Sequence, residues 1–201
     1  MIKVVIADDE RLIRDAFAAL LGFEDDISVV AVASSGPVVI AEAANHQPDV
    51  ALLDLQMPDM DGIETASRLL AAHPDLAVMI VTSHGRPGYL KRALEVGVRG
   101  FVPKTVSASA LASAVRSVAA GGRYIDPDLA AEAMQAGDCP LTARECDVLE
   151  LAADGAPIDE IAAKASLSAG TVRNYLSSAM LKLDAANRHE AAQTARRYGW
   201  I

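Results

Sequence analysis

Carboxylates follow two short apolar runs of the sequence. Asp8 and Asp9 come directly after the run at residues 4–7. Asp54 comes directly after the run at residues 50–53. Three carboxylates gathered in one place repel one another, which raises their pKa values unless a cation neutralises them. Mg²⁺, a hard divalent ion that prefers oxygen ligands, is the cation that we expect at this cluster.

A hydroxyl group and an ammonium group follow two later apolar runs. Thr82 follows the run at residues 77–81, and Lys104 follows the run at residues 100–102 after one intervening residue, Pro103. Such a set of groups is suited to phosphoryl transfer, in which Asp54 attacks phosphorus while Thr82 and Lys104 stabilise the phosphoryl oxygens. Any one of these residues is more often a helix cap or a solvated side chain. Their joint appearance after successive runs favours a phosphate site with Asp54 as the acceptor.

The spacing of apolar residues indicates the elements that would position these groups. Over residues 1–120, five short apolar runs alternate with longer segments whose apolar positions lie three and four residues apart. Continuous apolar runs are typical of strands buried on both faces, so we predict an α/β fold, a doubly wound (βα)5 parallel sheet. With the strand order 2-1-3-4-5, the first and third strands are neighbours, and functional groups collect at the carboxyl ends of such strands.

A second part of the chain has the pattern of helices only. Residues 1–120 form the first predicted domain, residues 121–140 a linker with a short helix at 128–136, and residues 141–201 an all-α domain of four helices. Thr142 and Glu145 have the spacing of a capping box, which starts the first of these helices.

Residues 158–183 have the pattern of two short helices separated by a break at residues 166–168. The outward positions of the second helix hold small or hydrogen-bonding side chains, namely Thr171, Arg173, Asn174, Ser177 and Ser178. Such side chains suit the major groove of DNA, although a solvated helix face is the commoner origin of a polar stripe. The cations expected to contact DNA phosphates are Lys164, Lys182 and Arg188.

Composition narrows the function classes. The net charge of −9 argues against a protein that coats nucleic acid through bulk electrostatics. Cys139 and Cys146 are the only cysteines, and their number and spacing predict reduced thiols rather than a disulfide framework. The longest apolar stretches are too short for a membrane span, and Asp8 and Asp9 interrupt the N-terminus before a signal-peptide core, so we expect a cytoplasmic protein.

The motifs IADDE, LLDLQMPDMDG, MIVTS and GFVPK resemble those of the receiver domain of bacterial two-component response regulators. The resemblance implies an Mg²⁺ site at Asp8 and Asp9 with a backbone carbonyl from Gln56, and phosphorylation at Asp54. It also implies that Thr82 and Lys104 contact the phosphoryl group and that Phe101 changes rotamer with Thr82. Many receivers have Pro directly after the Lys, whereas here Pro103 precedes it. We further hypothesise that Gln56 and His84 set the lifetime of the phosphorylated state.

Residues 141–201 resemble the LuxR-type helix-turn-helix domain, on the motifs LTARECDVLELAADG, EIA and SAGTVRNYLSSAMLKL. The whole chain therefore resembles the NarL/FixJ family of response regulators, and SHGRPGY, GTVRNYLS and YGWI are most similar to the membrane-lipid (desaturase) regulators. Family members commonly have Gly where this chain has Ser166. The resemblance implies that Arg173, Asn174 and Ser177 face base edges and that Thr171 faces a phosphate.

The combined expectation is a transcription factor, not an enzyme, that a sensor histidine kinase phosphorylates and that binds double-stranded promoter DNA. We expect phosphorylation to cause homodimerisation, which raises DNA affinity through effective concentration. One expected dimer surface is the face formed by the fourth helix, the fifth strand and the fifth helix. The other is a pair of helices, in which the first helix contributes Ile13 and Phe17. The fifth helix contributes small residues, namely Ala108, Ala110, Ala112 and Ser113.

Three alternatives are weaker. A haloacid-dehalogenase-type phosphohydrolase needs a second Asp two residues after the nucleophile, and this chain has Gln56 there. A regulator that ignores phosphorylation would keep the acidic pocket only as a scaffold. A module that binds a protein and not DNA would not need the polar outward positions of the helix at 169–183.

Overall fold

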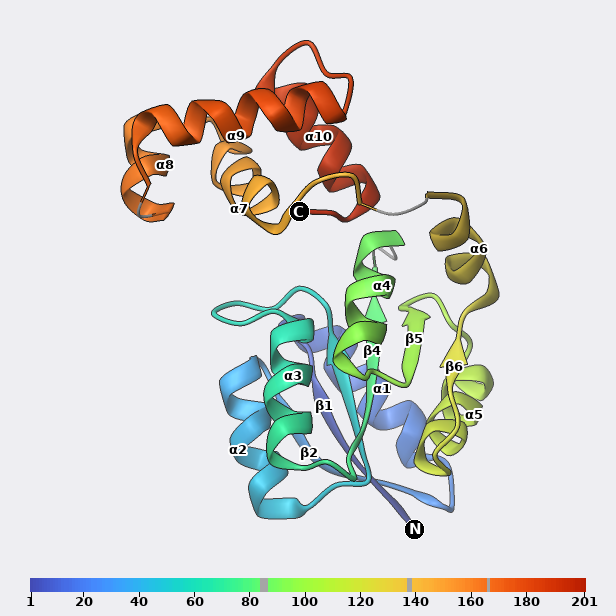
Figure 1. Cartoon of the computed structure of the whole chain (residues 1–201). Helices are drawn as coiled ribbons and strands as arrows, with labels where there is room; N and C mark the ends of the chain where they lie inside the picture. Colours follow the sequence, from blue (N-terminus) through green and yellow to red (C-terminus); the bar gives the residue numbers. More distant parts are fainter. Residues whose placement is uncertain (84–86, 137–138, 166) are drawn as a thin grey trace. The chain divides into compact units, whose positions relative to one another are not determined.

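The computed structural model describes residues 1–83, 87–136, 139–165 and 167–201. It divides the chain into two compact units, with most of residues 1–131 in the first and residues 132–201 in the second (Figure 1). His84 and Ser166, on which two sequence-based expectations rest, lie outside the described residues.

A six-stranded parallel sheet forms the middle layer of the first unit, in the order β2-β1-β3-β4-β5-β6. The strands are β1 (Ile2–Ala7), β2 (Ile27–Ala33), β3 (Val50–Asp54), β4 (Ala77–Thr82), β5 (Gly100–Pro103) and β6 (Tyr124–Ile125). The helices between them are α1 (Arg11–Gly22), α2 (Gly36–His46), α3 (Gly62–Ala72), α4 (Pro87–Val96) and α5 (Ala108–Ala119). The predicted order 2-1-3-4-5 is confirmed, with one strand added beyond β5.

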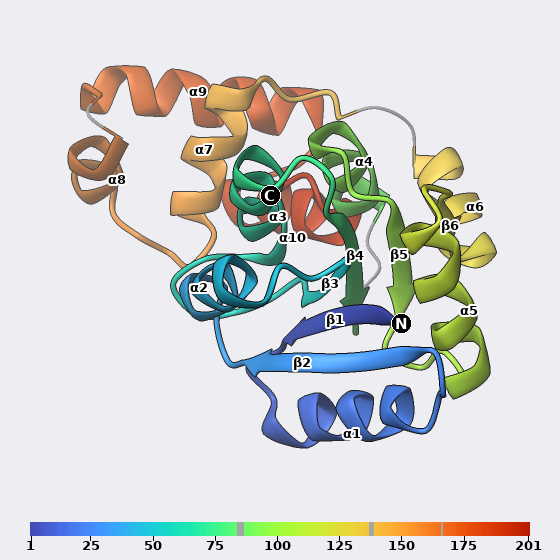
Figure 2. The same cartoon turned by 90° about the horizontal axis from the view of Figure 1, so that it is seen from below.

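Helices cover both faces of this sheet. Helices α1 and α5 lie on one face, while α2, α3 and α4 lie on the other (Figure 2). Every residue of β3 and β4 is buried, as continuous apolar runs predict. On the α1 and α5 side, Phe17 and Leu111 belong to one hydrophobic cluster with Ile6 and Leu52.

The sixth strand is the main departure from the predicted fold. The linker was expected to contain one short helix, but Tyr124 and Ile125 first pair with β5. The backbone N–H of Tyr124 donates to the carbonyl of Arg99 at 2.9 Å, and that of Asp126 donates to the carbonyl of Phe101 at 2.9 Å. A two-residue strand is too short to give a periodic signal in the sequence. The expected short helix follows as α6 (Pro127–Ala136).

The second unit contains the four predicted helices α7 (Ala143–Ala152), α8 (Ile158–Ala165), α9 (Ala169–Lys182) and α10 (Arg188–Tyr198). Their apolar stripes meet in a core of their own, to which Leu149, Ile161, Val172 and Leu176 contribute. The capping box that starts α7 is present.

Gly62 at the start of α3 allows the chain to pass close to the end of β3. Its N–H donates to the carbonyl of Leu55 at 2.9 Å, and a Cβ atom at Gly62 would overlap the carbonyl oxygen of Asp54. A side chain at this position would therefore push against the backbone that carries Asp54.

We predict that Gly62→Ala lowers the free energy of unfolding by about 1–3 kcal/mol, because inserting a methyl group into packed backbone forces a shift. Gly22→Ala is the matched control, since no described atom lies within 4 Å of the added Cβ and the change should be neutral or stabilise by about 0.4–1 kcal/mol. Urea unfolding of both variants measures the difference. Equal losses in the two variants would contradict this account of Gly62.

Candidate phosphoryl-transfer site and nucleic-acid interface

The three predicted carboxylates meet at the carboxyl edge of the sheet. Asp8 and Asp9 follow β1, Asp54 ends β3, and these two strands are direct neighbours. One ligand oxygen from each of the three lies within 4.8 Å of the others. Asp8 is 1% exposed and Asp54 is 6% exposed, whereas Asp9 is open to solvent. This set of hard oxygen donors fits a divalent cation such as Mg²⁺.

Lys104 brings a positive charge into the same pocket. Its Nζ atom lies 2.9 Å from Oδ2 of Asp8 and 3.2 Å from Oδ2 of Asp54. The backbone N–H of Lys104 donates to the carbonyl of Thr82 at 2.8 Å, which ties the start of its loop to the end of β4. Pro103 directly before Lys104 therefore does not keep the ammonium group away from the carboxylates.

Glu10 is a member of the pocket that the sequence did not reveal. Its Oε1 atom accepts a hydrogen bond from Nζ of Lys104 at 2.9 Å, although the carboxylate is largely exposed. The residue was visible in the motif IADDE, but its partner lies 94 positions away in the chain. Lys104 thus contacts three carboxylates, of which Glu10 is the outermost.

Burial dominates the protonation of the proposed acceptor. Burial raises the pKa of Asp54 to about 6, the charge of Asp8 adds to this effect, and the charge of Lys104 opposes it. Repulsion between the acids was expected to be the main cause, so desolvation is the larger effect here. For Lys104, burial lowers the pKa, but the hydrogen bonds with Asp8 and Glu10 outweigh burial and raise it above its ordinary value.

The other predicted pocket residues occupy different surroundings. Thr82 ends β4 and is 2% exposed, and Phe101 in β5 is fully buried. Gln56 follows β3 and is exposed. Thr82 and Phe101 are therefore interior residues on neighbouring strands, with Ile80 directly opposite Phe101 in the register.

Helix α9 in the second unit presents the predicted polar face. Ser168 caps the helix, because its Oγ atom accepts a hydrogen bond from the N–H of Thr171 at 3.1 Å. The hydroxyl groups of Ser168 and Thr171 also lie 2.8 Å apart. The side chains expected to contact bases, Arg173, Asn174 and Ser177, are all exposed, while Val172, Leu176 and Ala179 are buried.

A buried carboxylate on α7 holds α9 in place. Glu145 is 4% exposed, and it accepts hydrogen bonds from Oγ of Ser178 at 2.6 Å and from Nζ of Lys182 at 2.7 Å. Its Oε2 atom also accepts from the N–H of Thr142 at 2.6 Å, which completes the capping box. Burial opposes ionisation of Glu145, but the hydrogen bonds from Lys182, Ser178 and Thr142 lower its pKa to about 2.

All three cations predicted to contact phosphate have partners within the unit. Lys182 binds Glu145, as described above, and Ser178 points to the same carboxylate although it was expected to face outward. The guanidinium group of Arg188 donates to the carbonyl oxygens of Ala156 at 3.0 Å and Gly155 at 3.4 Å. Lys164 is exposed and pairs along its own helix with Glu160 at 2.8 Å.

Comparison with known families covers both units. Residues 4–116 match the family described as response regulator receiver domain, and residues 139–195 match the family described as bacterial regulatory proteins, luxR family. The chain belongs to the LuxR-type response regulators. The NarL/FixJ resemblance expected from the motifs is thereby confirmed.

Relatives match this response regulator over its whole length. The transcriptional regulatory protein DesR of Bacillus subtilis (strain 168) is 39% identical over 201 residues, which is 100% of each chain. The transcriptional regulatory protein UhpA of Escherichia coli (strain K12) is 38% identical, over 96% of this chain and 97% of UhpA. A solved complex of the two-component response regulator RcsB with DNA is 25% identical with a TM-score of 0.69, over 98% of each chain. The expected similarity to the desaturase regulators agrees with the match to DesR, and UhpA is almost as similar.

Membership in this family assigns the chain to two-component transcription factors rather than to enzymes. The phosphohydrolase alternative is therefore set aside. Among the described residues, no helix is both long and apolar enough to cross a membrane.

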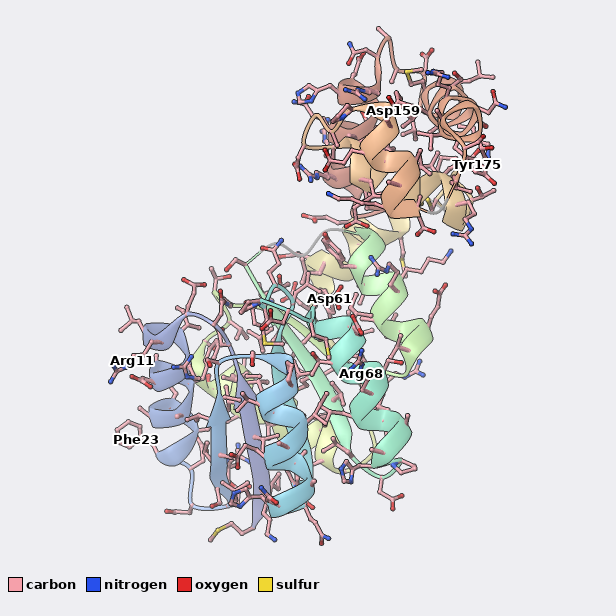
Figure 3. The ribbon with its side chains drawn as sticks, turned by 90° about the vertical axis from the view of Figure 1, so that its left-hand side faces the viewer. Arg11, Phe23, Asp61, Arg68, Asp159 and Tyr175 are labelled. Atoms are coloured by element: carbon pink, nitrogen blue, oxygen red, sulfur yellow. The ribbon has the colours of Figure 1, made fainter. Side chains whose placement is uncertain are left out.

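The apolar side chains that α1 exposes are not the ones that the sequence predicted. Phe17 is buried in the core, and so is Ala112 of α5. Leu12 in α1, at 80% exposure, and Phe23 directly after α1, at 83%, are two of the large apolar side chains that face solvent, and Phe23 points away from the ribbon in Figure 3. Helical periodicity had identified an apolar stripe on α1 but not which of its residues face the core, so Phe17 was wrongly expected on the surface.

We predict that Asp54→Asn raises the melting temperature at pH 8 without divalent ions, because an ionised carboxylate is no longer buried. The pKa of Asp54 is higher in the folded chain, about 6, than the ordinary aspartate value of 3.8. Ionisation therefore costs the folded wild type stability as pH rises from about 4 to 6, so the advantage of the variant should grow over this window and then level off. Circular dichroism melts at pH 4 and pH 8 measure it.

Asp25→Asn is the control, since Asp25 is exposed in the loop between α1 and β2 and its substitution removes the same charge from the protein. Adding Mg²⁺ at pH 8 should raise the melting temperature of wild type and of Asp25→Asn more than that of Asp54→Asn. An Asp54→Asn variant less stable than wild type at pH 8 would show that the Lys104 contact outweighs burial.

Proposed function

We propose that a sensor histidine kinase transfers a phosphoryl group to Asp54, and that this modification controls the binding of promoter DNA by α9. The observation that carries the proposal is the pocket at the carboxyl edge of the sheet, where Asp8, Asp9 and Asp54 meet and Lys104 contacts Asp8 and Asp54. Because promoter DNA is the proposed target, the proposed location is the cytoplasm of a bacterial cell.

Asp8, Asp9 and Asp54, with the backbone carbonyl of Gln56, would hold Mg²⁺. When bound, the ion supplies positive charge to the phosphoryl oxygens and keeps Asp54 ionised. An Oδ atom of Asp54 then attacks phosphorus as the bond to the donor breaks. Lys104 lies 3.2 Å from the Asp54 carboxylate, which is within reach of a phosphoryl group attached there.

The phosphoryl group would act as a switch on the interior of the first unit. It adds about 1.5–2 negative charges and new acceptor oxygens, towards which Thr82 and Lys104 move. Thr82 and Phe101 are both buried on the neighbouring strands β4 and β5, so movement of one changes the space that the other can fill. The surface of α4, β5 and α5 would then have two alternative packings.

We further propose that phosphorylation favours a homodimer. Leu12 and Phe23 give α1 an exposed apolar surface, and Ala108 and Ser113 leave exposed small positions on α5. The face formed by α4, β5 and α5 is the second candidate for the dimer surface. Pairing two DNA-binding units raises the affinity for paired half-sites without any new base contact.

In the DNA-binding unit, Arg173, Asn174 and Ser177 are proposed to face base edges and Thr171 a phosphate. This assignment is supported by the exposure of Arg173, Asn174 and Ser177 on the polar face of α9. Lys164 is the most accessible of the proposed phosphate contacts. Lys182 and Arg188 are proposed to act near phosphates while they retain their contacts with Glu145 and with the carbonyl groups before α8.

Incubation with acetyl phosphate and Mg²⁺ tests phosphorylation. We expect wild type and Asp59→Asn, which changes an exposed acid five residues further along, to gain one phosphoryl group by intact mass, and Asp54→Asn to gain none. The phosphorylated chain should sediment as a dimer and bind selected DNA more tightly. Equal DNA affinity with and without the modification would instead favour the alternative of a regulator that uses the pocket only as a scaffold.

Arg173→Ala should weaken binding to a selected DNA site by about 1–3 kcal/mol and binding to mixed-sequence DNA much less, if Arg173 makes a bidentate base contact. Lys164→Ala is the matched comparison, since loss of a phosphate contact weakens both duplexes alike and reduces the salt dependence. Fluorescence anisotropy at several salt concentrations measures both effects. An equal loss of affinity for both duplexes in Arg173→Ala would indicate that Arg173 contacts the DNA backbone and not a base.

A further inference from the structure

The two cysteines of the chain lie side by side in the second unit. The Sγ atoms of Cys139 and Cys146 are 3.9 Å apart, and both residues are half-buried and carry free thiols. The sequence predicted two unconnected reduced thiols, because a separation of seven residues across a helix start does not indicate a pair. A bonded pair of sulfur atoms is about 2.05 Å apart, so an approach of about 1.9 Å separates this contact from a disulfide.

We propose that Cys139 and Cys146 form a redox-responsive dithiol, which a peroxide converts into an intramolecular disulfide, and that this oxidation weakens DNA binding. Nothing in the phosphoryl-transfer site or in the polar face of α9 uses either thiol. The pair therefore lets the DNA-binding unit respond to oxidation independently of Asp54.

The chemistry needs two steps and one peroxide. A thiolate at Cys139 attacks one oxygen of hydrogen peroxide, the O–O bond breaks, and the hydroxide that leaves takes up a proton and becomes water. The sulfur of Cys146 then attacks the sulfenic acid, the S–O bond breaks, and the hydroxyl group leaves as water with the proton of Cys146. Two thiols and one hydrogen peroxide thus yield one disulfide and two water molecules.

The surroundings of the two thiols assign their roles. Burial and the neighbouring Cys139 together raise the pKa of Cys146 to about 12, so Cys146 stays protonated at neutral pH. Cys139, next to the end of the linker, is then the thiol that reacts first, and Cys146 resolves it. Disulfides in reducing compartments are usually transient or redox-sensing, which fits a pair that is reduced at rest.

The position of the pair couples it to α9. The segment closed by the disulfide, residues 139–146, includes Thr142 and Glu145, the two partners of the capping box. Glu145 is also the residue whose carboxylate binds Ser178 and Lys182 of α9. Pulling Cys139 and Cys146 together also removes the hydrogen bond from Cys139 Sγ to the carbonyl of Leu141. The closure therefore shifts the first turn of α7, and with it the anchor of the DNA-binding helix.

Treating the reduced full-length chain with hydrogen peroxide tests the proposal. The remaining thiols are then alkylated, and the chain is digested and analysed by mass spectrometry. Both cysteines should escape alkylation and appear in one disulfide-linked species, whose mass is two hydrogen atoms lower than that of the reduced peptides. Binding to a mixed-sequence duplex at fixed salt should become several-fold weaker and should recover with dithiothreitol.

Cys139→Ser keeps a polar side chain of similar size and should bind DNA equally well before and after peroxide. Cys146→Ala provides a second variant with the same expectation, should one of the two fold poorly. Oxidation that stops at sulfinic acid, or that links two chains, would overturn the dithiol. A linked peptide within one chain at unchanged DNA affinity would overturn its control of α9.

Discussion

The structure of the first unit depends on one ammonium group held among buried carboxylates. Lys104 reaches Asp8, Asp54 and Glu10 at the edge where β1 and β3 end. Without a cation, Asp8 and Asp54 would be two acids in contact and largely removed from water, an arrangement that burial and repulsion both disfavour. The short loop from β5 to α5, residues 104–107, must therefore deliver its lysine to this point, and the backbone hydrogen bond from Lys104 to Thr82 fixes where that loop begins.

The same pocket explains why the site can be reactive. A single lysine does not fully compensate the cost of burying Asp54, since its pKa remains raised to about 6. A divalent ion or a phosphoryl group with its own charge partners changes this balance, so the pocket responds to what it binds. Glu10 matters in this respect because its exposed carboxylate binds Lys104 from the solvent side.

Local patterns in the sequence predicted the parts of the fold that depend on local physics. Continuous apolar runs identified the strands, and the residues at their ends identified Asp8, Asp54, Thr82 and Lys104. The rest depends on contacts between residues far apart in the chain. Glu10 meets Lys104 over 94 positions, Glu145 meets Lys182 over 37, and Arg188 meets Ala156 over 32, and no spacing rule relates such pairs. Strand β6 was missed for the opposite reason, because two residues are too few to show a period.

Glu145 and Asp54, two of the buried carboxylates that bind a lysine, show how one interaction can serve two purposes. Glu145 has donors for both oxygens, with Ser178 at Oε1 and with Lys182 and Thr142 at Oε2, and its pKa falls to about 2. Its contribution to stability is present above the ordinary glutamate pKa of 4.5 and is lost only as pH falls towards 2, so at neutral pH it is a permanent anchor of α9. Asp54 binds one lysine that it shares with Asp8 and Glu10, and its ionised form is disfavoured. Hydrogen bonds thus keep Glu145 ionised, whereas burial makes the ionised form of Asp54 costly, and this difference distinguishes a structural acid from the one proposed to accept a phosphoryl group.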